Sequence, residues 1–287
     1  MNLFRKIFGD KNSNEKENEI LSQEHFFELK YIKELVDKYK KPTILLRPHK
    51  ANQQISNSES KFGGIPNLEN FNSYPCCSEC ETPLNFVFQL YKKDFPTFYF
   101  PEETNLFQLF RCPNNDCPDA YSEKYDHKMF TYYSNSSPMT QKELLKPSCN
   151  LKELEIEVPD CFLKPLHMDD FPNYDDFNGN DFTIIEEKFG EDISEKFMEE
   201  YCAIQRTKIG GYPSYTQSPE YPVCTCGKTK EFIFQLSSED MEDGVENPPP
   251  ADMWSPHGIM IGDVGNIYFY VCKSCGKETI ESNWDCY

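Results

Sequence analysis

The sequence contains no long hydrophobic run. A helix that crosses a bilayer needs roughly 18 or more consecutive apolar residues, and polar residues interrupt every apolar stretch of this chain well before that length. The first residues, MNLFRKIFGDKN, are too short and too interrupted by charge to form a signal peptide. These absences exclude a spanning helix, and they predict a cytoplasmic protein with no membrane partner.

Basic residues are scarce. The 287 residues include 29 Lys and Arg against 48 Asp and Glu, a formal net charge of −19. This charge would repel a nucleic-acid backbone, so no nucleic-acid partner is expected. Residues 151–200 alone contain 16 acidic and 4 basic side chains, a net charge of −12. That segment is either a solvated connector or an acidic surface for a basic partner, and the sequence leaves both interpretations open.

The sequence gives little support for a disulfide framework. It has 13 cysteines, an odd number, and no signal peptide is expected. Eight of the cysteines fall into close pairs. Close pairs in a chain that is not secreted indicate metal binding in a reducing compartment.

Catalytic signatures are missing as well. The five histidines are scattered along the chain: His25, His49, His127, His167 and His257. None lies in a nucleophile elbow or in a His-Glu-x-x-His helix. Only His257 has a partner in its own loop that suggests chemistry, Asp263. We therefore predict that the protein is not an enzyme and has no catalytic or cofactor-binding residues beyond metal ligands.

What the sequence does contain is a repeat. Residues 61–66, KFGGIP, recur as KIGGYP at 208–213, and Tyr-Pro-x-Cys follows both copies at the same spacing. FVFQL at 86–90 then recurs as FIFQL at 232–236. Agreement in order, spacing and chemistry predicts an internal duplication. Two copies are too few for a solenoid, so we expect two pseudo-symmetric halves that share one core.

The predicted fold is α+β, mainly antiparallel β, and the predicted organisation has four parts. They are an N-terminal segment with a helix (1–42, helix at 19–40), a first β-rich half (43–150), an acidic connector with a helix (151–204, helix at 190–204) and a second β-rich half (205–287). Strands are expected at 43–48, 84–91, 105–111, 128–134, 154–158, 229–236, 258–262, 265–272 and 278–284. Abundant Phe and Tyr favour strands over helices in both halves.

The close cysteine pairs form two sets of four. The first set is Cys77-x2-Cys80 with Cys112-x4-Cys117, and the second is Cys224-x-Cys226 with Cys272-x2-Cys275. Each pair lies beside a predicted strand, and a hairpin brings the ends of its two strands together. Zinc binds four thiolates tetrahedrally with no position left for water, so the sets predict two structural zinc sites. Unmetallated buried cysteines and a disulfide or redox role remain as alternatives.

The other cysteines are less informative. Cys76 could replace Cys77 as a ligand, and Cys286 is close to the second set only in sequence. Cys149, Cys161 and Cys202 have no neighbouring cysteine and are predicted to be core residues.

Two further features of the repeat have structural interpretations. The Lys-x-Gly-Gly-x-Pro motif could hold an anion, but it lacks a following strand-to-helix element, so we predict a turn with positive φ at the glycines. Gln89 and Gln235 lie inside apolar strands, and each is predicted to hydrogen-bond buried backbone.

Parts of the sequence resemble known families. SKFGGIP, TKIGGYPSYTQ and GDVGNIYFYVC resemble the YwqG-like family of bacterial proteins, whose biochemical function is undefined. CSECETPLNFVFQLYKKDFP, LFQLFRCPNNDC and CTCGKTKEFIFQL resemble the related programmed cell death protein 2 family. Together the resemblances cover about residues 43–287. The resemblance to the programmed cell death protein 2 family implies that both cysteine sets correspond to cysteine sets of that family. The zinc finger that its animal members insert between the halves is missing from this sequence.

The second resemblance also implies a function, namely dedicated chaperoning of a small-subunit ribosomal protein. We therefore expect a non-enzymatic, zinc-stabilised protein-binding protein, a chaperone or adaptor for a basic client. An immunity protein that neutralises a bacterial toxin, and a hydrolase or redox enzyme, are the alternatives.

Overall fold

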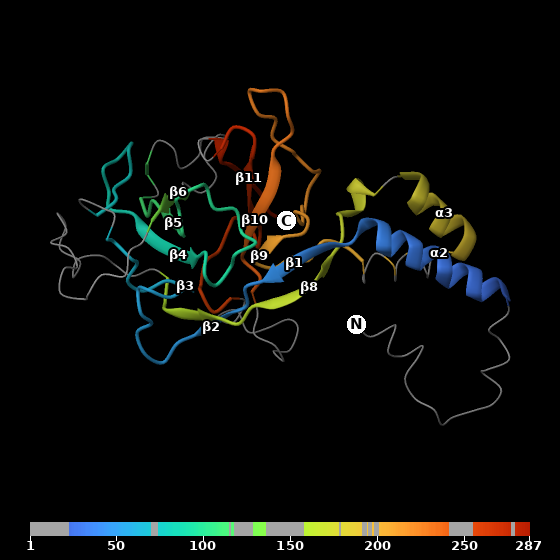
Figure 1. Cartoon of the computed structure of the whole chain (residues 1–287), viewed down its shortest axis with the longest axis horizontal. Coiled ribbons are helices and arrows are strands. Elements are labelled where there is room, and N and C mark those ends of the chain that lie inside the picture. Colours follow the sequence, from blue (N-terminus) through green and yellow to red (C-terminus); the bar gives the residue numbers. More distant parts are fainter. Residues whose placement is uncertain are drawn as a thin grey trace.

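The computed structural model describes residues 23–69, 74–114, 116–117, 129–135, 158–177, 179–190, 194, 197, 201–240, 255–276 and 279–287. Over them the chain forms a β-rich body and a helical arm that extends from one end of it (Figure 1).

Two six-stranded antiparallel sheets make up the body. The first sheet contains, in spatial order, β12 (Glu281–Asp285), β11 (Asn266–Val271), β10 (Glu231–Ser237), β9 (Lys208–Gly210), β1 (Lys41–Leu45) and β8 (Leu166–Asp170). The second sheet contains β2 (Pro48–Lys50), β7 (Cys161–Leu163), β3 (Lys61–Phe62), β4 (Asn85–Tyr91), β5 (Leu106–Arg111) and β6 (Met129–Ser134). The predicted mainly antiparallel β fold is confirmed.

The long strands form where aromatic and branched residues are concentrated. β4 has the sequence NFVFQLY and β11 has NIYFYV, and nearly every residue in both is buried. Such side chains fit a pleated surface and lose little conformational freedom in an extended chain. These strands are covered on both faces, which is why the sequence reads as continuous apolar runs there.

One predicted strand is wrong. Residues 258–262 form no strand, because Gly258 and Gly262 both have positive φ angles, 69° and 51°. Between them, the amide of Ile259 donates to His257 Nδ1 and that of Ile261 donates to Ser238 Oγ. The segment therefore buries Ile259 and Ile261 as a loop and does not pair with a neighbouring strand. The predicted helix at 190–204 and the predicted strand at 154–158 lie mostly outside the described residues.

A continuous β-ribbon connects the two sheets. β1 and β2 pair with β8 and β7 in a register that runs without a shift from Lys41↔Asp170 to Lys50↔Cys161. At its centre, the Lys164 amide donates to the Arg47 carbonyl at 3.1 Å, and Arg47 Nε donates to the Lys164 carbonyl at 3.0 Å. β1 and β8 belong to the first sheet, whereas β2 and β7 belong to the second. The segment predicted as a connector therefore supplies two strands of the body.

The two sheets share one strand order. When β1–β6 are matched in sequence to β7–β12, the run β3-β4-β5-β6 in one sheet corresponds to the run β9-β10-β11-β12 in the other. The ribbon strands are exchanged between the sheets, because β7 and β2 follow β3, whereas β1 and β8 follow β9. The ladders also break at the same point. A bulge lies between Phe86 and Phe88 in β4, and another lies between Phe232 and Phe234 in β10.

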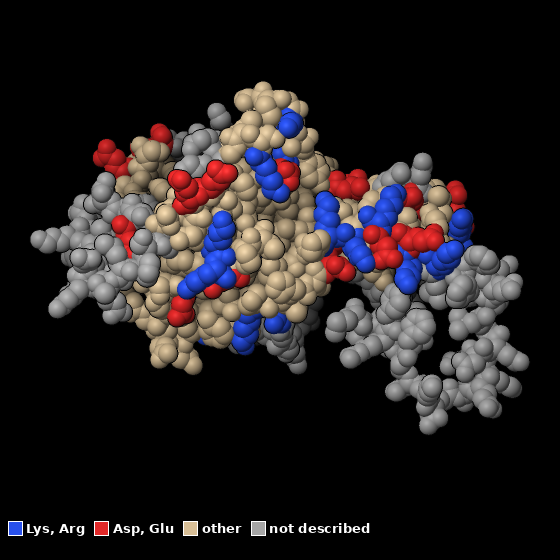
Figure 2. Space-filling view, in the orientation of Figure 1, with Lys and Arg blue, Asp and Glu red and all other residues tan. Residues whose placement is uncertain are grey.

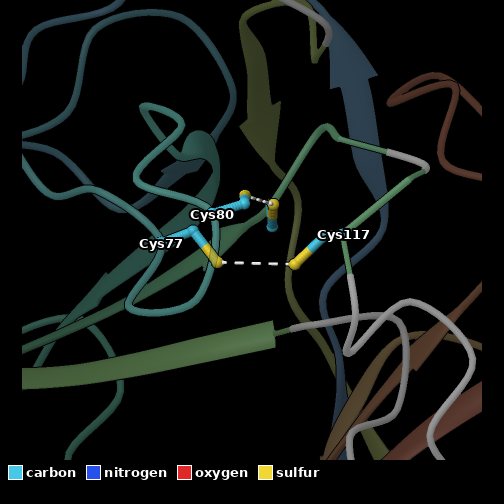
Figure 3. Close-up of side chains that lie close together, drawn as sticks. Cys77, Cys80 and Cys117 are labelled. Atoms are coloured by element: carbon cyan, nitrogen blue, oxygen red, sulfur yellow. Dashed lines mark hydrogen bonds between the residues drawn. The ribbon is translucent and has the colours of Figure 1, made fainter.

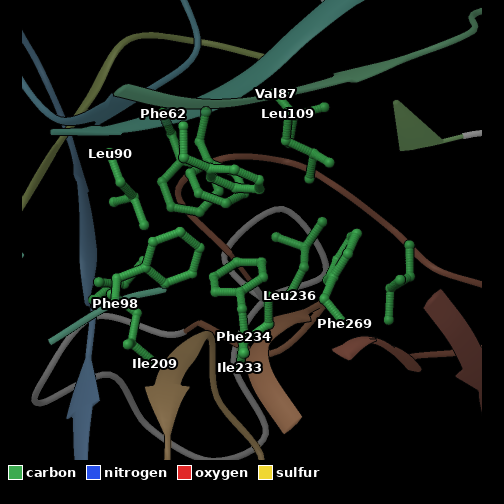
Figure 4. Packing of buried hydrophobic residues seen from close by; sticks show 14 of the residues in the cluster. Phe62, Val87, Leu90, Phe98, Leu109, Ile209, Ile233, Phe234, Leu236 and Phe269 are labelled. Carbon is green, nitrogen blue, oxygen red and sulfur yellow. The ribbon is translucent and has the colours of Figure 1, made fainter. Parts of the chain in front are cut away.

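The sheets face each other across one hydrophobic core (Figure 4). Its centre is aromatic: the rings of Phe88 and Phe234, from opposite sheets, lie 4.8 Å apart. Phe62 packs on Phe88, and Phe98 inserts between Phe107 and Phe234. Burying one such side chain stabilises a fold by roughly 1.5–3 kcal/mol. Both sheets contribute to the cluster, so neither has a complete core alone.

The helical arm has its own small core. α2 (Gln23–Tyr39) lies where the sequence predicts a helix at 19–40, and it packs against α3 (Gly179–Phe189). A short 3-10 helix, η4 (Tyr174–Asp176), leads into α3. Leu35, Phe177, Ile185 and Phe197 are the buried residues of this cluster. Acidic and basic side chains lie next to each other over the arm (Figure 2).

Neither described helix has the length and apolar character needed to cross a membrane.

Candidate metal centres

The first cysteine tetrad, Cys77, Cys80, Cys112 and Cys117, lies at one end of the β4–β5 hairpin. Two of its cysteines precede β4 and two follow β5, and the pair Asn85↔Arg111 places these ends side by side. A tight loop holds the first two, because the Cys77 amide donates to the Thr82 carbonyl at 2.8 Å and Leu84 donates to Pro75 at 3.0 Å. The antiparallel hairpin therefore gathers four thiols that are far apart in sequence.

The sulfur separations in this tetrad suit a metal ion. Cys77 Sγ lies 3.8 Å from Cys117 Sγ, and Cys80 Sγ lies 3.5 Å from Cys112 Sγ (Figure 3). All four ligand atoms lie within 4.8 Å of one another. Four sulfurs at the usual zinc–sulfur distance of about 2.3 Å form a tetrahedron with edges of about 3.8 Å. The tetrad can therefore hold a metal ion and is compatible with zinc.

The second tetrad, Cys224, Cys226, Cys272 and Cys275, occupies the corresponding end of the β10–β11 hairpin. Its ligand atoms also lie within 4.8 Å of one another, with 3.7 Å between the sulfurs of Cys226 and Cys272. A glycine with positive φ closes each of its two turns. These are Gly227, whose amide donates to the Cys224 carbonyl, and Gly276, whose amide donates to the Cys272 carbonyl.

The electrostatics of both tetrads favour a bound cation. The hydrogen bond with Thr82 lowers the pKa of Cys80 to about 6, and burial raises the pKa of Cys112 to about 12. In the second tetrad, the Cys226 amide lowers the pKa of Cys224 to about 6, whereas the hydrogen bond with Cys226 raises the pKa of Cys275 to about 12. Thiolates this close repel one another, so a cation is needed for all four to ionise together.

The remaining described cysteines belong to neither tetrad. Cys76 is exposed and its thiol donates to the Tyr74 carbonyl, so the geometry uses Cys77 in its place. Cys161 is buried in the main core, as predicted, and Cys202 is half-buried, with its pKa raised to about 11 by burial. Cys286 lies beside Gly262. Cys149 lies outside the described residues.

The lysine of each Lys-x-Gly-Gly motif forms an ion pair with an aspartate. Lys61 Nζ lies 2.9 Å from Asp160 Oδ1, and Lys208 Nζ lies 2.8 Å from Asp170 Oδ2. Both lysine side chains are fully buried, and burial lowers the pKa of Lys208. In the second motif, Asp170 Oδ2 also accepts from the Tyr212 amide. The motif lysines thus neutralise protein carboxylates and are not presented to an external anion.

The glycines of the motif are required by this close approach. A Cβ at Gly64 would lie 2.1 Å from Asp160 Oδ1, and one at Gly211 would lie 2.3 Å from Asp170 Oδ2. All four motif glycines have positive φ, between 59° and 74°, so the predicted turn is confirmed. The aspartate partners were missed by sequence reasoning because they lie 99 and 38 residues away in the chain.

The two strand glutamines bond buried backbone, as predicted. Gln89 Oε1 accepts from the Asn67 amide, and its Nε2 donates to the carbonyls of residues 57 and 59. Gln235 Oε1 accepts from the Ser214 amide, and its Nε2 donates to the Arg206 carbonyl. Each glutamine therefore anchors the loop that follows its Lys-x-Gly-Gly motif.

The partner of His257 is Asp240 and not Asp263, the loop residue that the sequence offered as a possible partner. His257 is fully buried, and its Nε2 lies 3.0 Å from Asp240 Oδ2. Its ring stacks on Phe62 of the second sheet, with centroids 4.8 Å apart. The histidine therefore fastens a loop to the core. No pattern in the sequence identifies Asp240 as the partner, and Asp240 directly precedes a stretch outside the described residues.

Comparison with known proteins places these features in a family. A family model described as "Domain of unknown function (DUF1963)" matches residues 60–286, a range that includes both tetrads and both Lys-x-Gly-Gly motifs. The uncharacterized protein YpfL of Salmonella typhimurium is 31% identical over 70 residues. That match covers 24% of this chain and 13% of the Salmonella protein.

Proposed function

The chain belongs to the DUF1963 family, and we propose that it is a zinc-stabilised protein-binding protein and not an enzyme. The observation that carries the proposal is the geometry of the two tetrads. Each gathers four cysteine sulfurs within 4.8 Å, and four thiolates complete the coordination of zinc without leaving a position for water or substrate. Such closed sites stabilise folds, and they offer no Lewis acid to a substrate.

Serine variants with matched controls test the structural role of zinc. We expect Cys80→Ser and Cys226→Ser each to lower the zinc content by one ion per chain and to lower the unfolding temperature. Their controls are Cys76→Ser and Cys286→Ser, which lie near the tetrads in sequence but outside them. Equal zinc content in all four variants, measured by elemental analysis, would contradict the assignment.

We infer an internal duplication from the matched strand order. The shared bulge, the two buried lysine–aspartate pairs and the two equivalent glutamines support it. The strand order suggests halves that begin at β1 and β7 and not at the boundaries expected from sequence. We also infer a relationship to the YwqG-like and programmed cell death protein 2 families, on the motifs that the repeat contains.

For the partner, we propose a basic protein, such as the ribosomal protein that the second family resemblance implies. Four acidic side chains at the end of β8 and along the arm are exposed and available: Asp169, Asp175, Glu186 and Glu187. Two neighbours are not available, since Asp170 is buried against Lys208 and Asp176 accepts a hydrogen bond from Tyr221. The net charge of −12 over residues 151–200 favours encounter with a basic protein, and salt screens this attraction.

The test neutralises the available acids and leaves Asp170 intact. We expect the combined variant D169N/D175N/E186Q/E187Q to lose captured partner from native-host extract, with the loss greatest at low salt. The control neutralises four exposed glutamates that lie outside residues 151–200: Glu79, Glu81, Glu102 and Glu103. Retention of the same partner by both variants at every salt concentration would leave the acidic segment without a binding role.

The same charge would suit an immunity protein that neutralises a basic toxin. The identity of the captured protein separates the two proposals, because a ribosomal protein supports chaperoning and a secreted nuclease or similar toxin supports immunity. Turnover of a small-molecule substrate, lost on mutation of a tetrad cysteine, would instead support the hydrolase or redox alternative.

A further inference from the structure

The two tetrads differ in their exposure to solvent. In the first, Cys77, Cys112 and Cys117 are 3%, 4% and 1% exposed. In the second, Cys226 and Cys275 are exposed. The first tetrad is part of a hydrophobic cluster with aromatic and leucine side chains, whereas no described hydrophobic cluster includes a cysteine of the second. Cys80 of the first tetrad is half-buried, and Cys224 and Cys272 of the second are buried. The second tetrad therefore has two exposed cysteines where the first has none.

We propose that the second tetrad is a peroxide-reactive modification site, which forms a disulfide and releases its metal while the first tetrad stays intact. This inference rests on the proposed zinc occupancy of both tetrads. Its physical basis is access, because an oxidant in water must reach a sulfur before it can react.

Apolar side chains form a wall that covers the first tetrad. The second tetrad has different side chains at the equivalent ladder positions. Phe110 of β5 pairs with Phe130 of β6, and the equivalent Tyr270 of β11 pairs with Glu281 of β12. Phe130 packs against the cluster that contains the first tetrad. At the same position in the second half, the side chain is a carboxylate that is half exposed.

A second difference lies at the residue that directly precedes β4 in one half and β10 in the other. Leu84, two residues before Phe86, is fully buried in the cluster of the first tetrad. The equivalent residue, two before Phe232, is Lys230, which forms an ion pair with Glu281. Two apolar side chains of the first half are thus replaced by an ion pair, in which the lysine side chain is 9% exposed and the carboxylate is half exposed.

A tyrosine precedes the first cysteine of each tetrad, and the two tyrosines differ in exposure. Tyr74 is 5% exposed, and its hydroxyl donates to the Leu84 carbonyl at 2.8 Å, so its ring lies within the cluster of the first tetrad. Tyr221, its equivalent in the repeat, is 38% exposed, and its hydroxyl instead donates to Asp176 of η4. The ring of Tyr221 keeps the edge contact with Tyr270 that the ring of Tyr74 makes with Phe110, but more of it is exposed to water.

The proposed reaction uses hydrogen peroxide as the oxidant and two thiolates as the reductant. An exposed thiolate, that of Cys226 or Cys275, attacks one peroxide oxygen, the O–O bond breaks, and hydroxide leaves and is protonated to water. A neighbouring thiolate of the same tetrad then attacks the sulfenic acid sulfur and expels its oxygen as a second water. For Cys226, that neighbour is Cys272, whose sulfur lies 3.7 Å away. With two of its four ligands oxidised, the tetrad no longer holds the ion.

The experiment treats the full-length protein with hydrogen peroxide, follows zinc release with a chromogenic chelator, and maps disulfides by mass spectrometry. We expect one zinc ion per chain to be released, with a disulfide between cysteines of the second tetrad and unmodified cysteines in the first. Release of both ions together, or a disulfide within the first tetrad, would overturn the proposal. Protein that contains no zinc before treatment would instead refute the proposed function, so the two failures are distinguishable.

A sealing variant provides an independent test. Lys230→Leu with Glu281→Phe rebuilds the apolar wall of the first tetrad around the second, and we expect it to release zinc about tenfold more slowly, a barrier increase of about 1.4 kcal/mol. The control K273M/E231Q removes an ion pair at the end of the β10–β11 hairpin in which both side chains are exposed, and it should release zinc at the wild-type rate. Equal rates in the sealed variant, the control and the wild type would show that the wall does not govern access.

Discussion

At the scale of single residues, the buried ion pairs show how polar groups are used in this fold. Lys208 and Asp170 are both completely buried, and the carboxylate also accepts from the amides of Ile204 and Tyr212. A buried pair of this kind is weak evidence for stability by itself, but removal of one partner leaves an uncompensated charge. The pair therefore fixes where the ribbon meets the motif loop.

We expect Lys208→Met to lower the free energy of unfolding by about 3–5 kcal/mol, because Asp170 keeps its burial and loses its cation. Adding Asp170→Asn should restore part of this loss, since an amide oxygen can still accept from the two backbone amides. Denaturant unfolding of both variants measures the effect. Removal of an exposed ion pair such as Lys273–Glu231 costs about 0–1 kcal/mol, and a loss of stability as small as this in Lys208→Met would contradict the prediction.

Two glycines make a matched comparison of backbone strain and steric clash. Gly211 and Gly190 both have positive φ, 74° and 84°, but only Gly211 has a neighbour where a Cβ would lie, 2.3 Å from Asp170. We expect Gly190→Ala to destabilise by about 1–2 kcal/mol, the cost of a left-handed residue. Gly211→Ala should cost clearly more, because the carboxylate must also move. Equal costs in thermal unfolding would show that the carboxylate moves freely.

At the scale of elements, sequence reasoning succeeded where a strand is long. The strands near 84–91, 105–111, 128–134, 229–236, 265–272 and 278–284 all exist within about three residues of their expected bounds. Their aromatic and branched side chains signal a strand within a short window. The two tetrads could be predicted from the same hairpins, because the cysteine spacing is visible in the sequence and a hairpin determines which strand ends lie side by side.

The shorter strands could not be found in this way. β3 has two residues and β9 has three, so neither offers a period to detect. β8, LHMDD, has four exposed residues of five and lies in a strongly acidic segment, a pattern that predicts a connector and not a strand. These strands exist because they complete ladders with distant partners, and pairing across more than a hundred residues leaves no local signature.

The ribbon predicts that the two halves of the chain depend on each other. β1 completes the sheet of the second half and β7 completes that of the first, so a fragment of residues 1–150 lacks a central strand. We expect fragments 1–150 and 151–287 to give no cooperative unfolding transition separately and to regain one when expressed together. Near-ultraviolet circular dichroism and thermal melts would show this. A cooperative transition in fragment 1–150 alone would contradict the exchanged-strand account.

At the scale of the whole molecule, the two sheets have matching strand orders, and a cysteine tetrad lies at the end of one hairpin in each. The tetrads lie at corresponding hairpin ends, yet one is enclosed by aromatic side chains and the other faces water. β1 and β2 precede the range matched by the family model, although they complete both sheets. The complete fold therefore requires residues on the N-terminal side of the matched range.

The central claim is that each tetrad holds one zinc ion, and metal counting combined with X-ray absorption tests it most directly. We predict two zinc ions per chain in purified protein, with an absorption spectrum fitted by four sulfur neighbours at about 2.3 Å and no nitrogen or oxygen ligand. Fewer than one zinc ion per chain, or a first shell that includes oxygen, would contradict the account.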